Sequence, residues 1–245
     1  MDLSVVGPAY NEAPILHRNV TALRRFLQAR FAGQQWQVVI ADNGSTDGTT
    51  AIAAQLAQAD PRVVHLVVPT RGKGAAIRAA WQRYPATVRC FMDADLATDL
   101  DALPTLVSAV ADDGIDLAYG SRYLVGAAVE RSWSRRLTSA GYRWLQRLVL
   151  PTAISDAPCG FKAVGARLCE HLLPNVRDNG WFFDSELALS ADRLGFRTRG
   201  VAVRWREPRD RGQGSKVNVL RLSLTYSRRL WQLRRRLHRG GLAQP

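Results

Sequence analysis

The chain has 245 residues, of which 47% are hydrophobic, and a formal net charge of +13. This length suffices for one α/β core with a small appended segment, but hardly for two full domains. The three cysteines, Cys90, Cys159 and Cys169, lack the paired spacing of a zinc or redox motif, and their odd number argues against a disulfide framework, so we expect a reducing, cytoplasmic setting. We also expect no secretory leader and no helix that spans a membrane.

Two segments carry the positive excess. Residues 131–155 contain five arginines and no acid, and residues 216–245 contain seven arginines, Lys216 and no acid. The rest of the chain is therefore neutral overall. Such localised basic faces suit anionic lipid headgroups, phosphates or nucleic acid, and charge alone does not choose among them.

Short β-branched runs alternate with helical patterns through the first half of the chain. We predict strands at Leu3–Gly7, Trp36–Asp42, Val63–Val68, Thr87–Met92 and Asp116–Gly120, with helices between them. This rhythm predicts an α/β fold with a mostly parallel central sheet flanked by helices. Ligands of such sheets bind beyond the carboxyl ends of the strands, so the polar loops that follow the strands are the candidate sites.

The first such loop is Pro8-Ala9-Tyr10-Asn11-Glu12. A turn fixed by the proline would present an aromatic ring, on which a base can stack, together with two polar side chains. The alternative is an ordinary connection in which Asn11 caps the following helix.

The second loop runs from Ala41 to Thr49. Asp42, at the end of its strand, could accept the imino hydrogen of a uracil, and Gly44 would allow close approach of the backbone. Asp47 or Ser45 could cap the next helix. A purely structural loop remains the alternative.

The third loop, Arg71-Gly72-Lys73-Gly74, opens a helix. Backbone amides at a helix start, with the Lys73 cation, could contact a diphosphate. By itself this is a weak signal.

The fourth loop contains Asp93-Ala94-Asp95 after an apolar strand. Because alternate residues of a strand point the same way, we expect the two carboxylates to be aimed at one spot. Mg²⁺ or Mn²⁺, together with diphosphate oxygens, would relieve their repulsion. The cation would also stabilise a departing nucleotide diphosphate as a Lewis acid.

Two amphipathic patterns follow. The first places Trp133, Leu137, Trp144, Leu145 and Leu148 on one face, with Arg135, Arg136, Arg143 and Arg147 at other positions. It is typical of an interfacial helix. The second places Leu220, Leu224, Leu230, Trp231, Leu233 and Leu237 in an apolar stripe, flanked by Arg228, Arg229 and Arg234–Arg236. We therefore expect one main domain over residues 1–215 and a basic amphipathic helix with a short tail over residues 216–245.

Taken together, the motifs resemble family 2 glycosyltransferases of the GT-A fold. PAYNE, ADNGSTDG, RGKG, MDADLATD, GSRY, DAPCGFK, WFFDSE and GSKV occur in the order typical of that family. The resemblance is strongest to the branch of dolichyl-phosphate β-glucosyltransferases and polyprenyl-phosphate glycosyltransferases, and it extends from about residue 3 to residue 217. Eight ordered motifs are far more specific than any one of them.

The resemblance implies roles for individual residues on the donor side. Pro8, Tyr10, Glu12 and Asp42 match the nucleoside pocket, Lys73 matches a position near the diphosphate, Asp93 would approach the ribose or sugar and the metal, and Asp95 the metal. Asn43 is a departure, since relatives often have a second Asp there. The RGKG segment favours a UDP-sugar over GDP-mannose.

On the acceptor side, Arg122 resembles an arginine that faces the acceptor phosphate, where a guanidinium makes paired hydrogen bonds. A surface ion pair is its alternative role. Arg135 or Arg136, and Lys216, would join it.

Asp156, and Asp184 with Glu186, are candidate active-site carboxylates, and Trp181 suits the core or a sugar platform. A phosphate acceptor is already anionic, whereas an alcohol acceptor would need one of these carboxylates as a general base.

The leading hypothesis is inverting transfer of a hexose, glucose, from a UDP-sugar to a polyprenyl phosphate. The basic helices would hold the enzyme at the cytoplasmic face of the membrane, although relatives often use transmembrane helices for this. One alternative is a soluble family member with a hydroxyl acceptor. A non-enzymatic nucleic-acid binder is a remote alternative, because the basic segments lack a known nucleic-acid motif and the Asp-x-Asp loop would have no role.

Overall fold

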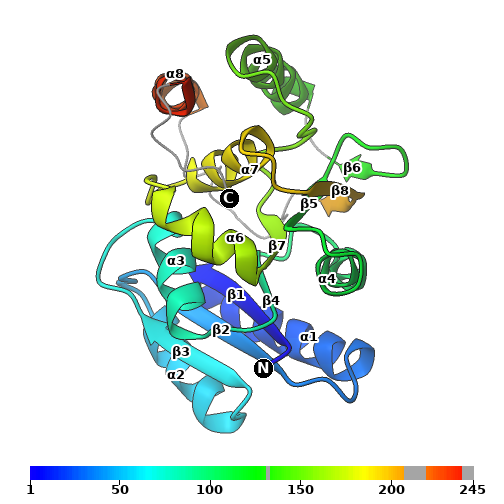
Figure 1. The fold of residues 1–245 in the computed structure, drawn as a ribbon. Helices are drawn as coiled ribbons and strands as arrows, with labels where there is room; N and C mark the ends of the chain where they lie inside the picture. The colour runs from blue at the N-terminus through cyan, green and yellow to red at the C-terminus, as the bar shows by residue number, and fades with distance from the viewer. Residues whose placement is uncertain (131–132, 207–218, 239–245) are drawn as a thin grey trace.

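In the computed structural model, which describes residues 1–130, 133–206 and 219–238, a seven-stranded sheet has the order β3-β2-β1-β4-β7-β5-β8 (Figure 1). The strands of this sheet are β1 (Leu3–Ala9), β2 (Trp36–Asp42), β3 (Val63–Val67), β4 (Val88–Met92), β5 (Leu117–Ser121), β7 (Phe161–Gly165) and β8 (Thr198–Ala202). A second, two-stranded sheet pairs β6 (Ala128–Glu130) with β9 (Arg204–Arg206). All strand pairs are parallel except those that β7 makes with β4 and β5. The predicted α/β fold with a mostly parallel sheet is therefore confirmed.

Helices cover both faces of the large sheet. They are α1 (Ala13–Arg30), α2 (Thr49–Ala59), α3 (Lys73–Arg83), α4 (Leu103–Ala111), α5 (Trp133–Val149), α6 (Ala166–His171), α7 (Phe183–Arg193) and α8 (Val219–His238), with short 3₁₀ turns at Leu100–Ala102 and Leu173–Asn175. α1, α2 and α4 contribute to one apolar cluster, whereas α3, α6 and α7 contribute to the other. The sheet thus lies between two helical layers.

Strand β2 shows why both faces are covered. Each of its residues is buried, and alternate side chains enter different clusters: Val38 and Ile40 join one, Val39 and Ala41 the other. A strand that is buried on both faces reads as a continuous apolar run rather than as an alternating one. This run explains why the predicted bounds of β2 agree with the structure.

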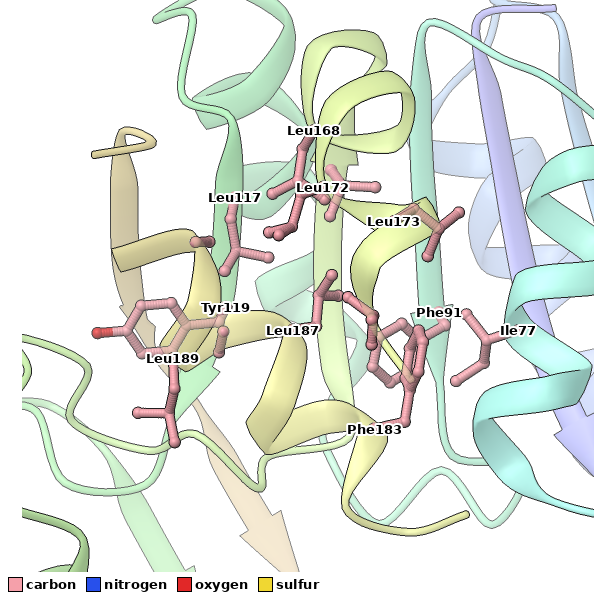
Figure 2. Packing of buried hydrophobic residues seen from close by; sticks show 14 of the residues in the cluster. Ile77, Phe91, Leu117, Tyr119, Leu168, Leu172, Leu173, Phe183, Leu187 and Leu189 are labelled. Carbon is pink, nitrogen blue, oxygen red and sulfur yellow. The ribbon is translucent and has the colours of Figure 1, made fainter. Parts of the chain in front are cut away.

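The cluster beneath the loops described below centres on aromatic packing between α7 and β4 (Figure 2). The rings of Phe91 and Phe183 lie 6.3 Å apart in an edge-on arrangement, and Trp81 of α3 packs against both. Such aromatic pairs stabilise a core beyond the area they bury. They fix α7 against the carboxyl end of β4.

Helices α5 and α8 lie together at one end of the molecule, beyond α7 (Figure 1). The predicted apolar stripe of α8 is directed partly at the protein, because Leu230 and Leu233 are fully buried in the core. Trp144 and Leu148 of α5 and Trp231 of α8 remain exposed. No helix within the described residues is long and apolar enough to cross a membrane.

Candidate functional site

The loops after β1 and β2 are joined by hydrogen bonds at the carboxyl edge of the sheet. The Asn11 side-chain oxygen accepts from the amide of Thr46 at 2.8 Å, and the Asn11 amide donates to the hydroxyl of Ser45 at 3.1 Å. Asn11 adopts φ = 55°, a conformation that Asn tolerates better than most residues. The suggestion that Asn11 caps α1 is therefore wrong: Glu12 occupies the cap position, and its own amide donates to Thr49 Oγ1.

Two residues expected in a nucleoside pocket lie near this junction. Pro8 lies within β1, opposite Ala41, and the pairing of β1 with β4 ends before it, at Val6. The strand therefore tolerates a residue without an N–H on that side. Tyr10 is 41% exposed, and the guanidinium of Arg71 lies 5.6 Å from its ring centroid. The side chain is therefore partly accessible, and base stacking requires an accessible ring.

Asp42 is buried at the end of β2. Its Oδ1 accepts from the amide of Ser45 at 3.1 Å, and its Oδ2 from the hydroxyl of Thr50 at 2.5 Å. Although burial favours the neutral acid, these hydrogen bonds hold the pKa of Asp42 below its ordinary value. The carboxylate is therefore charged and fixed at neutral pH.

The Arg71-Gly72-Lys73-Gly74 segment packs tightly against the loop before α7. Gly72 has φ = 132°, and a Cβ there would lie 1.9 Å from the Asn179 carbonyl oxygen. The amides of Gly74 and Ala75 donate to the carbonyls of Gly180 and Asn179. These two amides bind protein groups, so the predicted diphosphate contact of this segment stays a prediction that falls mainly on Lys73.

Asn43 ties the β2 loop to this segment. Its side-chain oxygen accepts from the Gly72 amide at 2.7 Å, and its side-chain nitrogen donates to the carbonyls of Gly72, at 2.7 Å, and Thr70, at 3.3 Å. An aspartate could reproduce the acceptance but not the two donations. The departure at Asn43 therefore has a structural role in this chain.

Lys73 brings together two carboxylates that are distant in sequence. Its Nζ lies 2.6 Å from Asp93 Oδ1 and 2.6 Å from Asp184 Oδ2, and it also lies over the rings of Phe91 and Trp181. Burial disfavours the ammonium, but the two carboxylates raise the pKa of Lys73 above its ordinary value. We call Lys73, Asp93 and Asp184 the lysine centre.

The Asp-x-Asp segment forms a turn rather than a continuation of β4. The strand ends at Met92, the Leu96 amide donates to the Asp93 carbonyl, and Leu96 has φ = 50°. Asp93 points to Lys73, whereas Asp95 Oδ1 accepts from the Ala97 amide at 3.1 Å. The two carboxylates are thus placed by a turn, and the expectation that strand alternation aligns them is wrong.

The residues present fit a divalent cation that binds together with a diphosphate. Within the described part of the chain, no cluster of three or more His, Cys, Asp or Glu side chains could hold a metal. Mg²⁺ commonly takes only one or two carboxylates and completes its shell with water and substrate phosphates. Asp93 and Asp95, both partly exposed, supply that number of carboxylates.

Arg122, directly after β5, forms a bidentate pair with Asp156. Arg122 Nε donates to Oδ2 at 2.7 Å, one terminal nitrogen donates to Oδ1 at 2.8 Å, and the backbone amide donates to Oδ2 at 3.0 Å. Burial disfavours the guanidinium charge, but Asp156 raises the pKa of Arg122 above its ordinary value. We call this pair the arginine centre. The two side-chain bonds use two of the five guanidinium N–H groups.

The remaining predicted residues have different outcomes. Trp181 is 56% exposed, so its assignment to the core is wrong and the platform role stays a prediction. Glu186 is structural: it accepts from the amides of Arg177 and Asp178 and pairs with Arg236 of α8. Arg135 lies in α5, but its side chain is outside the part of the chain that the structure describes. Lys216 lies outside the described residues.

A cleft of about 320 Å³ adjoins the lysine centre. Residues 177–182 line one side, and Thr225, Tyr226 and Arg229 of α8 line the other. Trp181 belongs to both the cleft wall and the surroundings of Lys73. Sequence reasoning placed the site at strand ends and did not predict this second wall, because α8 is distant in sequence.

Comparison with known proteins gives a family match. The model described as glycosyl transferase family 2 matches residues 4–173. The chain is 34% identical over 234 residues to the glycosyltransferase AglD of Haloferax volcanii, covering 95% of this chain but only 38% of that protein. It is 31% identical to the dolichyl-phosphate beta-glucosyltransferase of Drosophila melanogaster, with 84% of this chain and 68% of the relative covered.

Two further similarities are to a polyprenol enzyme and to a solved structure. The chain is 34% identical to the polyprenol monophosphomannose synthase of Mycolicibacterium smegmatis, with 83% of this chain and 77% of the relative covered. Its fold matches that of glucosyl-3-phosphoglycerate synthase from Mycobacterium tuberculosis, crystallised with Mn²⁺, UDP-glucose and phosphoglyceric acid. That match has a TM-score of 0.68 and 22% identity, and it covers 99% of this chain and 80% of the other.

Proposed function

The chain belongs to glycosyl transferase family 2, and we propose that it is a metal-dependent inverting enzyme that moves glucose from UDP-glucose to a polyprenyl phosphate. Residues 1–215 would form the transferase domain, and residues 216–245 a basic C-terminal segment. Because family membership explains the fold and the motifs, a non-enzymatic nucleic-acid binder is not needed to explain them.

The observation that carries the acceptor assignment is the state of the two candidate bases. Both oxygens of Asp156 accept from Arg122. Asp184 is 2% exposed and contacts Lys73. A general base must come within hydrogen-bond reach of the proton that it removes. Neither carboxylate is placed for that task, so an acceptor that needs no deprotonation fits the site best.

A phosphate monoester is such an acceptor. One of its anionic oxygens attacks the anomeric carbon, a new carbon–oxygen bond forms, and the bond from that carbon to the β-phosphate oxygen breaks. Arg122 orients the attacking phosphate with the N–H groups that Asp156 does not use, and Asp156 fixes the plane of the guanidinium. UDP leaves with both electrons of the broken bond, and no proton is transferred in the step.

On the donor side, Tyr10 offers its ring to the uracil, with Pro8 and Glu12 nearby in the chain. Asp42 would accept the imino hydrogen with a lone pair that Ser45 and Thr50 leave unused. Lys73 holds Asp93 beside the diphosphate position. Asp93 and Asp95 would hold Mg²⁺ or Mn²⁺, which when bound neutralises charge on the departing diphosphate. The solved fold neighbour was crystallised with Mn²⁺ and UDP-glucose, which supports this choice of cation and nucleotide.

The sugar is assigned from the relatives and from one segment of the sequence. One relative is named a glucosyltransferase and another a mannose synthase. The Arg71-Gly72-Lys73-Gly74 segment resembles the glucosyl branch. We therefore propose UDP-glucose rather than GDP-mannose.

The exposed apolar side chains of α5 and α8 support attachment to a membrane surface, which we propose is the cytoplasmic face. Trp144 is 68% exposed, and Leu148 and Trp231 are also exposed, within helices rich in arginine. Tryptophan and basic residues favour the headgroup region of anionic membranes. Arg135 and Lys216 would add to this basic surface and to the acceptor-phosphate contacts.

Vesicle flotation tests the attachment. The protein should float with phosphatidylglycerol vesicles at low salt, and Trp144→Ser combined with Trp231→Ser should reduce the bound fraction. Val67→Ser, which removes an exposed apolar side chain from β3 at the far edge of the sheet, is the matched control. Equal binding by the double variant and the control would contradict the proposal that α5 and α8 contact the membrane.

The acceptor assignment is tested with a matched pair of lipids. Purified protein, Mg²⁺ and UDP-glucose are incubated with a polyprenyl phosphate or with the polyprenol of the same length. We expect glucosylation of the phosphate alone. Faster glucosylation of the alcohol would contradict the proposal. It would support Asp156 or Asp184 as the general base.

A further inference from the structure

Lys162 is a fully buried lysine in the strand between the two centres. Strand β7 pairs with β4 on one side and with β5 on the other, and Lys162 lies opposite Phe91 in the first pairing and Tyr119 in the second. Asp93 follows Phe91 by two residues, and Arg122 follows Tyr119 by three. Because β7 is antiparallel to both neighbours, it starts where they end.

The ammonium of Lys162 holds the turn that leads into β7. Its Nζ donates to the carbonyl of Ala157 at 2.9 Å and also to the carbonyl of Cys159, and it lies 5.6 Å from the centre of the Phe91 ring. A lysine buried among apolar residues is unfavourable unless its donors are satisfied. The burial of Lys162 is therefore tied to the shape of this turn.

Residues 156–160 form this turn, and it reaches both centres. At one end, the carboxylate of Asp156 pairs with Arg122. At the other, the carbonyl of Gly160 accepts from the Asp93 amide at 3.1 Å. A Cβ at Gly160 would lie 2.2 Å from Asp93 Oδ2, so the turn also sets the space available to that carboxylate.

We propose that Lys162 is a positioning residue for both substrates: by holding the carbonyls of Ala157 and Cys159, it sets the turn that aligns Asp156 with Arg122 and Gly160 with Asp93. The assignment of the two centres to acceptor and donor rests on the proposed function. The mechanical link between Lys162 and the two centres does not.

Lys162→Met tests the link, because methionine fills a similar apolar volume but leaves the two carbonyls without a donor. Val164→Ala is the matched control: it removes buried volume from the same strand and touches neither centre. Backbone hydrogen exchange is measured at Asp93 and Cys159, whose amides donate to Gly160 and Asp156. No substrate is needed, so the result is independent of whether lipid transfer is observed.

We expect both amides to exchange about tenfold faster in Lys162→Met than in Val164→Ala at matched global stability. Equal exchange in the two variants would overturn the proposal. Should Lys162→Met fail to fold, Lys162→Gln replaces it, since the neutral amide retains donors. It should show an intermediate acceleration, and exchange at the wild-type rate would count against the role of the ammonium.

A double-mutant cycle supplies the functional arm. At temperatures below the unfolding transition, Lys162→Met should raise the Kd for UDP with Mn²⁺ by about tenfold. It should raise the KM for the phosphate acceptor by about the same factor. In the Asp156→Asn background, the effect on acceptor KM should fall to about twofold, because the alignment is already lost. Fully additive effects would show that Lys162 does not act through Asp156.

Discussion

The lysine centre and the arginine centre lie at the ends of β4 and β5, the two strands that flank β7, yet they balance charge differently. In the lysine centre, a single ammonium contacts two carboxylates, and Asp95 follows in the same turn. In the arginine centre, one guanidinium meets one carboxylate through two side-chain bonds. The first sets two carboxylates against one ammonium with Asp95 beside them, which suits a cation with a diphosphate. The second is neutral and keeps N–H donors for an anion.

The carboxylates of the two centres also differ in how exposed they are. The Asp93 side chain is 41% exposed, whereas the Asp156 side chain is fully buried beneath a largely buried Arg122. A carboxylate that must meet a substrate-bound cation has to be reachable, whereas one that only orients an arginine does not. This difference supports the proposed division, with donor chemistry at the lysine centre and acceptor positioning at the arginine centre.

The largest effect is expected from Asp95→Asn. The amide keeps an oxygen that can accept from Ala97 but loses the charge that holds a cation, so turnover should fall about 10³-fold while the fold is kept. Initial rates with saturating Mg²⁺ measure this, and thermal unfolding checks the fold. Asp101→Asn, at an exposed acid in the following 3₁₀ turn, is the control. A rate like that of the wild type would end the metal assignment.

Next in size is the effect of Lys73→Met on stability. Removing the shared cation leaves two carboxylates facing each other, one of them buried, at a cost of about 3 kcal/mol. Urea unfolding at pH 7 measures the change, and Asp184→Asn should restore part of the loss.

This variant should also respond to pH in a defined direction. Burial raises the pKa of Asp184 above its ordinary value, against the opposing effect of Lys73. When the folded-state pKa of an acid is raised, protonation favours the folded state, so stability rises as the pH falls toward that pKa. Lys73→Met should therefore recover stability as the pH is lowered from 7 toward the ordinary pKa of an aspartic acid. A further loss over this range would contradict the assignment of unpaired carboxylates.

Arg122→Lys should affect the acceptor alone. A lysine cannot reproduce the bidentate geometry, so the KM for a phosphate acceptor should rise about 10- to 100-fold, while the Kd for UDP changes less than about twofold. Steady-state kinetics and calorimetry supply the two values. An equal rise in the acceptor KM and in the UDP Kd would contradict the proposal that Arg122 acts on the acceptor.

The smallest effect is expected from Asn43→Asp. The carboxylate would face the carbonyls of Thr70 and Gly72 that the amide now donates to, which should cost about 1–2 kcal/mol of unfolding free energy. Chemical denaturation measures this. Unchanged stability would show that the tie to Gly72 does not depend on the donated bonds.

Much of the fold could be predicted because local patterns determine it. The continuous apolar run of β2 and the turn residues after it fixed that strand, and the spacing of Trp133 and Leu145 indicated α5. The antiparallel direction of β7 could not be predicted, because the five residues Phe161–Gly165 do not reveal the direction of a strand. That direction follows from which neighbours the chain meets.

The candidate site was predictable residue by residue but not in its pairings. Lys73 and Asp184 are 111 positions apart, and only the packing of α7 on β4 brings them together. Lys162 gave a signal that was not used, since a lysine within an apolar strand indicates a buried charge with specific partners. For α8, periodicity indicated an apolar stripe but not that Leu230 and Leu233 would face the protein.

The most direct test of the central claim is a product analysis. Purified protein, Mg²⁺ and a polyprenyl phosphate are incubated with UDP-glucose, UDP-galactose or GDP-mannose, and the organic-extractable fraction is examined by mass spectrometry. We expect a lipid phosphate carrying one hexose, formed from UDP-glucose and absent with Asp95→Asn. A nucleotide sugar consumed without any lipid product, with the sugar recovered on a soluble hydroxyl acceptor, would contradict it.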